Sequence, residues 1–407
     1  MEKLAINGGN PVRNTPIYYG HQFIDDDDVD AVVNVLKSDY LTCGPAITEL
    51  ERSLCKITGA KYAVAVCNGT AALHAACYAA GFTNGDEVIT TPITFAASVN
   101  CILYVGAKPV FADINPDTYN ISPKSIEQKI NSKTKAVIAV DFTGQAAELD
   151  EIRAICQKNH LKFIEDGAHS IGTTYKDRPV GSIADLTTFS FHPVKTVTGG
   201  EGGAVLTNDK KLYEKLLLFR THGITRDERF MDLDTKLETD GSYVLEDWYY
   251  QQIDLGYNYR LTDIQAALIT SQLNKLNQFK AVRKNITRRY DNAFADSSGL
   301  ILQKEIKESD TVRHIYLVQL VLESLNVGRK EIYAALKAEN VYCNIHYIPV
   351  YYFPYYRKLG YQKGLCPNAE KLYERILTLP LYPSMREEDV SSVIAAVKKV
   401  VGFYSKS

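Results

Sequence analysis

The chain has 407 residues, of which 45% are hydrophobic and 23% charged, and this balance excludes a disordered or collagen-like protein. With 46 basic and 48 acidic residues the formal net charge is −2, and no long basic run occurs, so nucleic acid and anionic membranes are poor candidates for partners. There is neither a signal-peptide core at the N-terminus nor an 18-residue apolar run, and we expect a cytoplasmic protein.

The eight cysteines are scattered, with no C-x-x-C pair and no histidine at zinc-ligand spacing. We therefore expect reduced thiols, mostly in the core, and no metal site. The chain is longer than one hydrophobic core usually allows. We predict an N-terminal segment and large domain over residues 1–275, and a small C-terminal domain over 276–407.

Short apolar, β-branched runs alternate with helix-length segments between about residues 60 and 210. This alternation predicts an α/β domain whose mainly parallel sheet is buried on both faces, so that ligands bind beyond the carboxyl ends of the strands. The predicted strands cover residues 62–67, 86–91, 108–114, 135–142, 161–167, 185–191 and 202–208.

The second half of the chain begins with a polar, aperiodic segment over residues 225–250, of the kind that forms lids, binding loops or disordered connections. A helix is predicted over 262–278, and strands over 314–322 and 341–350. The C-terminal helix is expected to begin with a capping box formed by Ser384 and Glu387. Its apolar stripe consists of Val390, Val393, Ile394, Val397 and Val401.

Lys195 lies four residues beyond a predicted strand and is followed by the glycine-rich tract "GGEGG". Desolvation or nearby positive charge can make a lysine amine nucleophilic, and such an amine forms a Schiff base with an aldehyde. A lone lysine at this place is more often an ordinary turn residue. The functional interpretation therefore depends on the other residues around it.

Asp166 ends an apolar strand in "EDGAHS", where a carboxylate needs a cation or several hydrogen-bond donors. The protonated ring nitrogen of pyridoxal phosphate is one such cation, and a helix N-cap is the structural alternative. His169 could bind the cofactor hydroxyl or be a structural histidine.

Gly69 and Thr70 open an alanine-rich helix after a strand, which is a favourable place for an anion. Ser190 could donate its hydroxyl to the same phosphate. Phe95 in "TPITFAAS" could stack on a planar cofactor. Each of these features also occurs in proteins without such a ligand, and Phe95 alone would more often be a core residue.

Taken together, the motifs resemble the DegT/DnrJ/EryC1/StrS family of pyridoxal-phosphate sugar aminotransferases over about residues 17–400. The motifs that carry the resemblance are "NGTAAL", "TPITFAAS", "EDGAHS", "SFHPVK…GGEGG" and "LGYNYRLTDIQAAL". The resemblance implies the type I aminotransferase fold, with a seven-stranded sheet in the large domain. It also implies a homodimer with active sites at the subunit interface.

The resemblance further implies roles for individual residues. Lys195 would bond to pyridoxal 5'-phosphate and Asp166 would partner its ring nitrogen. His169 would contact the ring hydroxyl and Phe95 would stack on the ring. The phosphate would be held by Gly69, Thr70 and Ser190, and by Asn258 of the second subunit.

Three further residues are candidates for binding the sugar nucleotide or the carboxylate of the amino donor. Arg260 suits planar, bidentate contacts with carboxylate or phosphate. His346 and Tyr347 lie in "HYIPV", and for Tyr347 a half-buried strand position is an equally good explanation.

Segments such as "RTHGIT", "NIHYIPVYYFPYYRKLGY" and "LTLPLYPSM" are most similar to one branch of the family. That branch uses L-glutamate to aminate C4 of a UDP-linked 4-keto-6-deoxy-N-acetylhexosamine. The product is UDP-4-amino-4,6-dideoxy-N-acetyl-β-L-altrosamine, on the route to pseudaminic acid. Other keto sugars, on dTDP or GDP and aminated at C3 or C4, would use the same cofactor residues.

Three other functions agree less well with the sequence. A related class of sugar dehydratases carries histidine where Lys195 stands, which argues against dehydration. A regulator that binds the cofactor without turnover is disfavoured because Lys195, Asp166 and Ser190 are all present. A metal hydrolase is disfavoured because no histidine and carboxylate cluster has ligand spacing.

Overall fold

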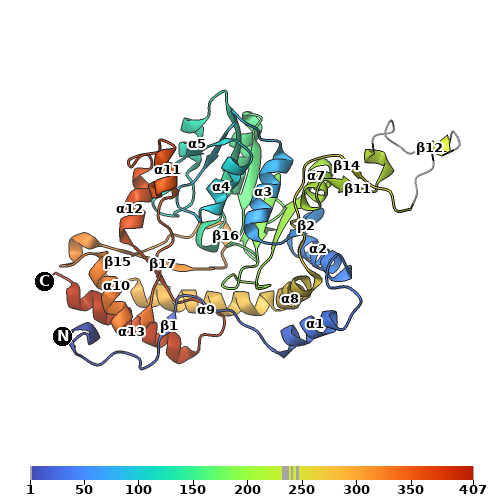
Figure 1. Ribbon diagram of the computed structural model, residues 1–407. Helices are drawn as coiled ribbons and strands as arrows, with labels where there is room; N and C mark the ends of the chain where they lie inside the picture. Colours follow the sequence, from blue (N-terminus) through green and yellow to red (C-terminus); the bar gives the residue numbers. More distant parts are fainter. Residues whose placement is uncertain (1, 232–237, 240–241, 244–246, 407) are drawn as a thin grey trace.

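The computed structural model describes residues 2–231, 238–239, 242–243 and 247–406, and a seven-stranded sheet forms its centre (Figure 1). The strands lie in the order β2-β10-β9-β6-β5-β3-β4, and β10 alone runs antiparallel to its neighbours. All seven predicted strands are confirmed. They are β2 (Tyr62–Val66), β3 (Glu87–Thr90), β4 (Lys108–Phe111), β5 (Thr134–Val140), β6 (Lys162–Asp166), β9 (Leu186–Ser190) and β10 (Gly203–Thr207).

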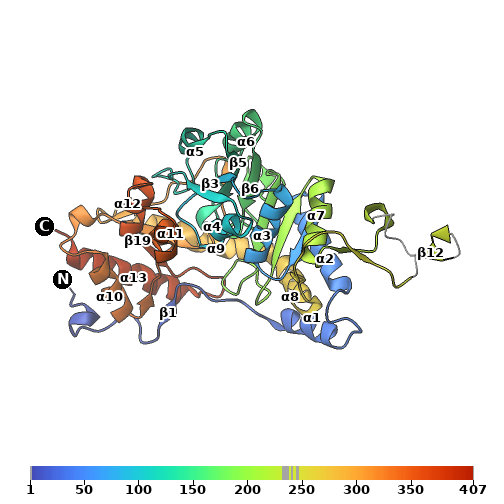
Figure 2. The same cartoon turned by 45° about the horizontal axis from the view of Figure 1, so that its top comes forward.

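Both faces of this sheet are covered by helices, which explains why its strands read as near-continuous apolar runs. One face packs against α3 (Gly69–Ala80), α4 (Ala97–Tyr104) and α7 (Lys210–Arg220). The other face packs against α2 (Pro45–Thr58), α5 (Pro123–Lys129), α6 (Leu149–Lys158) and α8 (Asp263–Asn274). Figure 2 shows α5 and α6 beside β5 and β6.

A second apolar cluster surrounds a smaller antiparallel sheet with the strand order β15-β17-β19. The predicted strand over 314–322 is β17, and the other two strands were not predicted. The elements here are β15 (Leu300–Leu302), β17 (Tyr316–Leu320), β19 (Ile376–Leu379), α9 (Leu276–Phe294), α10 (Arg329–Ala338) and α13 (Glu387–Tyr404). The boundary after residue 275 stays a prediction.

The helix predicted over residues 262–278 is two helices, α8 and α9, that meet at Lys275. Thr262 and Gln265 form a capping box at the start of α8. Lys275 interrupts the helical backbone with φ −96° and ψ 1°, and its amine pairs with Asp28 at 2.9 Å. The sequence therefore predicts the helical residues correctly. The break at Lys275 goes with its contact with Asp28, which is distant in the sequence.

The strand predicted over residues 341–350 is wrong beyond Tyr342. Only β18 (Val341–Tyr342) is a strand, because its partner β1 (Ile17–Tyr18) is equally short. Beyond it the chain forms an isolated bridge between Asn344 and Thr378, and the His346 ring hydrogen-bonds the Thr378 hydroxyl at 2.9 Å.

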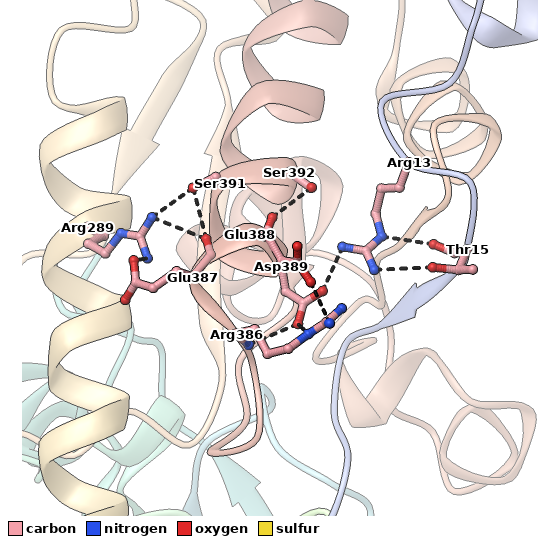
Figure 3. A network of polar contacts seen from close by, with 9 residues as sticks. All are labelled: Arg13, Thr15, Arg289, Arg386, Glu387, Glu388, Asp389, Ser391 and Ser392. Atoms are coloured by element: carbon pink, nitrogen blue, oxygen red, sulfur yellow. Dashed lines mark hydrogen bonds and ion pairs between the residues drawn. The ribbon is translucent and has the colours of Figure 1, made fainter.

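The start of α13 also differs from the prediction, since Ser384 does not cap the helix. The helix begins at Glu387, and Figure 3 shows the side chains around its first turn. The Arg386 backbone N–H donates to Asp389 Oδ2 at 2.9 Å, and Asp389 accepts a second hydrogen bond from Arg13 at 2.9 Å. A carboxylate in the first turn thus does the capping that was assigned to a serine. Val390, Val393, Val397 and Val401 are buried as expected, and Ile394 is half-buried.

The segment over residues 225–250 starts and ends in a short ribbon, in which β11 (Ile224–Thr225) pairs with β14 (Gln251–Gln252). Its hairpin of β12 (Glu238–Thr239) and β13 (Ser242–Tyr243) stands apart from the body in both views (Figures 1 and 2). Much of the predicted lid or binding loop lies outside the described residues.

The remaining elements are peripheral. They are α1 (Asp26–Leu36), α11 (Pro354–Lys358), α12 (Pro367–Arg375), β7 (Thr174–Tyr175), β8 (Arg178–Pro179) and β16 (Ser309–Asp310). All eight cysteines are unpaired and five of them are buried. In the described part of the chain, no helix is both long and apolar enough to span a bilayer.

Candidate active site

A cavity of about 670 Å³ lies beyond the carboxyl ends of the parallel strands, between the large sheet and the segment after β18. It is lined by the junctions that follow β2, β3, β6 and β9, together with His314 and residues 344–348. Nine of the predicted site residues line this one cavity: Gly69, Thr70, Phe95, Asp166, His169, Ser190, Lys195, His346 and Tyr347.

The loop that carries Lys195 is closed at its base by two backbone hydrogen bonds. Phe191 N–H donates to the Gly202 carbonyl, and Gly199 N–H donates to the Phe191 carbonyl. The glycines are required locally. Gly200 has φ +76°, and a Cβ on Gly203 would lie 2.4 Å from the Asn68 carbonyl oxygen. The glycine tract thus lets the lysine loop fold against the start of α3.

The Lys195 side chain is half-buried and lines the cavity. Burial lowers the pKa of Lys195 to about 8, and the negative charge of Asp166 opposes this shift. An amine with this pKa is partly unprotonated near neutral pH, so it can act as a nucleophile and as a proton carrier. The exposed turn lysine considered for this position is therefore excluded.

Asp166 ends β6 with only 3% of its surface exposed. Its Oδ2 accepts from Ser98 Oγ at 2.6 Å and its Oδ1 accepts from Ala168 N–H at 3.1 Å; Ser98 in turn bonds Thr94 at 2.7 Å. Burial raises the pKa of Asp166, whereas these hydrogen bonds and Lys195 lower it. The carboxylate is oriented into the cavity, and no helix N-cap uses it.

Histidines form the wall opposite Lys195. His169 Nε2 lies 3.3 Å from the Tyr347 hydroxyl, and its ring is 4.5 Å from that of His314. Burial and the Lys195 charge hold the pKa of His169 well below its usual value, and they lower that of His346 to about 4. These rings are therefore neutral hydrogen-bonding groups at physiological pH.

The start of α3 faces the same cavity. Gly69 and Thr70 are its first two residues, whose N–H groups have no partner within the helix, and Asn68 caps it by accepting from Ala71 N–H at 2.8 Å. A Cβ on Gly69 would approach the Cβ of Ser190 to 2.8 Å, so only glycine allows this contact. Phe95 is 63% exposed at the mouth.

Two predicted residues lie away from the cavity of their own chain. Asn258 is exposed, and its backbone forms a bridge with Thr221. Arg260 lines a separate hollow of about 230 Å³, together with Cys43 and Arg220. Neither residue lines the cavity that contains Lys195 in the same chain.

Two residues of the site were not singled out from the sequence. Ser98 lies inside the motif "TPITFAAS", and a hydroxyl in the first turn of the helix there was an available signal. His314 is the first residue of a predicted strand, where nothing in the sequence marks it as a neighbour of His169.

The residues present fit pyridoxal phosphate. The helix start offers free N–H groups to a phosphate, and Asp166 offers a buried carboxylate to a protonated ring nitrogen. Near them, Thr188 Oγ1 and His169 Nδ1 are buried without a hydrogen-bond partner. Such orphaned polar atoms are expected where a bound group completes the hydrogen bonding.

The comparisons with known proteins agree with this geometry. The profile of the DegT/DnrJ/EryC1/StrS aminotransferase family matches residues 22–398. The spore coat polysaccharide biosynthesis protein SpsC of Bacillus subtilis is 40% identical over 391 residues, which cover 96% of this chain and 98% of that protein. A UDP-4-amino-4,6-dideoxy-N-acetyl-beta-L-altrosamine transaminase of Campylobacter jejuni is 37% identical over 395 residues, which cover 94% of this chain and 99% of that protein.

Solved structures extend the likeness to the whole fold. Helicobacter pylori PseC, an aminotransferase involved in the biosynthesis of pseudoaminic acid, matches with a TM-score of 0.88 at 30% identity, over 96% of this chain and 100% of that one. A Streptococcus pneumoniae protein solved in its pyridoxal-phosphate form matches with a TM-score of 0.85 at 30% identity, over 95% and 99%. The chain therefore belongs to the DegT/DnrJ/EryC1/StrS family and is a pyridoxal-phosphate-dependent sugar aminotransferase.

Proposed function

We propose that this enzyme moves the amino group of L-glutamate to C4 of a UDP-linked 4-keto-6-deoxy-N-acetylhexosamine. The product would be UDP-4-amino-4,6-dideoxy-N-acetyl-β-L-altrosamine. The Lys195 amine, facing Asp166 in one cavity, is the observation that supports transamination. The likeness to the Campylobacter jejuni transaminase and to PseC supports the choice of sugar.

We propose the same contacts with pyridoxal phosphate that the resemblance implies. Lys195 forms the covalent link, Asp166 faces the ring nitrogen, and His169 faces the ring hydroxyl. Phe95 covers the ring. Gly69, Thr70 and Ser190 hold the phosphate.

Pyridoxal phosphate supplies an electron sink for the bond that breaks at the donor Cα. The protein supplies the proton transfer, and Lys195 is placed for it because its amine has a pKa of about 8. In the first half-reaction the Lys195 amine would accept the proton from the donor Cα and pass it to the cofactor carbon that carries the nitrogen, and in the second it would move a proton from that carbon to C4 of the sugar. His346 and His169 are much weaker bases than Lys195, because burial and the Lys195 charge lower the pKa of both rings.

The acceptor and donor are proposed to bind at the mouth of the cavity. His346 and Tyr347 lie there, and burial raises the pKa of Tyr347, so its hydroxyl remains a hydrogen-bond donor at all physiological pH values. Arg260 would meet the carboxylate or diphosphate from the neighbouring subunit, because it lies outside the cavity of its own chain.

A homodimer is proposed for the same reason. Asn258 is exposed and lies away from its own cavity, so it can contact a cofactor phosphate only in a second copy. We expect a mass in solution of twice 45.5 kDa. A stable monomer in light scattering, active at the same concentration, would contradict the shared site.

The sugar assignment is tested by turnover. With L-glutamate and the UDP 4-keto-6-deoxy-N-acetyl-L-hexose as substrates, we expect 2-oxoglutarate and a 4-amino sugar, with the configuration at C4 established by NMR. The corresponding dTDP 4-keto sugar without the N-acetyl group should react at least about tenfold less efficiently, because unpaired polar groups of the site oppose its binding. Absence of turnover with the UDP sugar would overturn the assignment.

A different nucleotide-linked keto sugar is the second candidate. SpsC, named for spore coat polysaccharide biosynthesis, is 40% identical to this chain, whereas the altrosamine transaminase is 37% identical. The same experiment decides between the two, since a preference for the dTDP sugar would favour this candidate.

A further inference from the structure

Two acidic side chains, Asp141 and Glu165, are buried on the sheet face opposite the cavity. Asp141 follows β5, and Glu165 precedes Asp166 in β6; Val140 pairs with Asp166 across these parallel strands. Side chains alternate along a strand, so Val140 and Asp166 reach the cavity while Asp141 and Glu165 point the other way. Both of these side chains are 0% exposed.

The hydrogen-bond partners of this acidic pair are neutral. Asp141 Oδ2 accepts from Ser170 Oγ at 2.6 Å, and its Oδ1 accepts from Ala147 N–H at 2.9 Å. Glu165 Oε2 accepts from Thr187 Oγ1 at 2.8 Å. Among the described residues, no basic side chain forms an ion pair with either carboxyl group.

The surroundings of the pair therefore favour a bound proton. Burial and the neighbouring Glu165 raise the pKa of Asp141 well above its usual range, and burial also raises that of Glu165. The charge of Asp166, on the cavity side of the same strand, adds to the repulsion. Two adjacent carboxyl groups without a cation cannot both ionise, so they share one proton and carry a single charge.

Asp141 joins the two segments that flank His169. Ser170 belongs to the turn that carries Asp166 and His169, and Ala147 ends the loop over residues 142–147. In that loop Phe142 places its ring 6.3 Å from the ring of His169. The loop is further fixed by Thr143, whose carbonyl accepts from the His314 N–H at 2.8 Å.

We propose that Asp141 is a positioning residue for the cofactor site. It holds the turn over residues 166–170 against the loop over 142–147, and so it orients Asp166 and His169 towards the cofactor. Asp141 does this as the neutral member of the acidic pair, with the shared proton directed to Glu165. This inference rests on the proposed cofactor roles of Asp166 and His169.

The neutral form leads to a specific expectation for two substitutions. Asp141→Ala leaves the Ala147 N–H without its acceptor and the Ser170 hydroxyl with only the Gly167 carbonyl at 3.3 Å, in a place that water does not reach. Asp141→Asn keeps one acceptor oxygen for the Ala147 N–H, adds a donor towards Glu165, and leaves the pair with the same single charge, while the Ser170 hydroxyl can turn to the Gly167 carbonyl. The asparagine variant should therefore behave like the wild type.

The experiment measures the apoenzyme rather than its turnover. Pyridoxal phosphate is titrated into apo wild type and variants, and the absorbance of the bound cofactor is then followed against pH. We expect Asp141→Ala to raise the dissociation constant about tenfold, since one to two lost buried hydrogen bonds correspond to such a factor. It should also shift the pH midpoint of the absorbance change, and Asp141→Asn should restore both values.

Asp113→Ala is the matched control. Asp113 likewise accepts backbone hydrogen bonds, from Ala369 at 3.0 Å and Asn368 at 2.9 Å, but it lies outside the cavity. It should lower the melting temperature while leaving the dissociation constant and the pH midpoint unchanged. If Asp141→Ala does not fold, Ser170→Ala removes one of the two contacts alone and should weaken cofactor binding in the same direction.

Three outcomes would overturn the inference. One is a folded Asp141→Ala variant with wild-type affinity and pH midpoint, and another is a Ser170→Ala variant with wild-type affinity where Asp141→Ala is unfolded. The third is an Asp141→Asn variant as impaired as Asp141→Ala, which would show that a charge is needed. Wild-type protein that binds no pyridoxal phosphate would instead remove the proposed cofactor roles, so the two failures are distinguishable.

Discussion

The substitution Lys195→Ala is expected to reduce transamination at least about a thousandfold. It removes both the covalent link to the cofactor and the group that carries the proton, and a positioned acid and base alone contributes two to four orders of magnitude. The absorbance spectrum is the direct measurement. Wild type should show the band of the lysine-bound cofactor and lose it on addition of L-glutamate, whereas the variant should never form that band.

Lys280→Ala is the control for this change. Burial lowers the pKa of Lys280 as well, but its amine does not line the cavity, so the spectrum and the rate should stay at wild-type values. Transamination by Lys195→Ala at more than a tenth of the wild-type rate would exclude Lys195 as the proton carrier.

Replacing Asp166 by asparagine should reduce kcat about a hundredfold or more while the fold is kept. The amide oxygen can still accept from the Ala168 N–H and the amide NH2 can donate to the Ser98 hydroxyl oxygen, but the amide has no charge with which to stabilise a protonated ring nitrogen. Loss of one preorganised electrostatic contact in a site that excludes water typically has an effect of this size. Steady-state rates, together with the pH dependence of the cofactor absorbance, provide the measurement.

Asp185→Asn tests whether the effect is specific to the cavity. Asp185 accepts a hydrogen bond from Phe163 N–H at 2.9 Å, at the opposite end of the same sheet. This variant should keep its kcat. Equal losses in the two variants would indicate damage to the sheet rather than a missing charge at the cofactor.

The large sheet and most of the residues that line the cavity could be predicted from the sequence alone. The inner strands of the sheet are buried on both faces, which produces an apolar run that can be recognised without any partner. Asp166 and Lys195 could be identified because they follow such strands, and the carboxyl ends of parallel strands meet at one edge.

Other features depend on contacts between distant segments. Ser98 acts through Asp166, which lies 68 positions further along the chain, and His314 reaches His169 from the smaller sheet. The end of β18 is set by the length of its partner β1, and the cap of α13 by a carboxylate that also binds Arg13. No local pattern contains these partners, so the sequence predicts neither them nor the boundaries that they impose.

A further apolar cluster joins the large-sheet region to the C-terminal part of the chain. In it Ile93, Val99 and Phe111 from β4 and the segment after β3 pack against Leu317 and Val350. Rigid-body opening of the enzyme would expose this shared core to water, at a large cost in free energy. Ligands are therefore expected to enter and leave through the mouth of the cavity, past the exposed ring of Phe95.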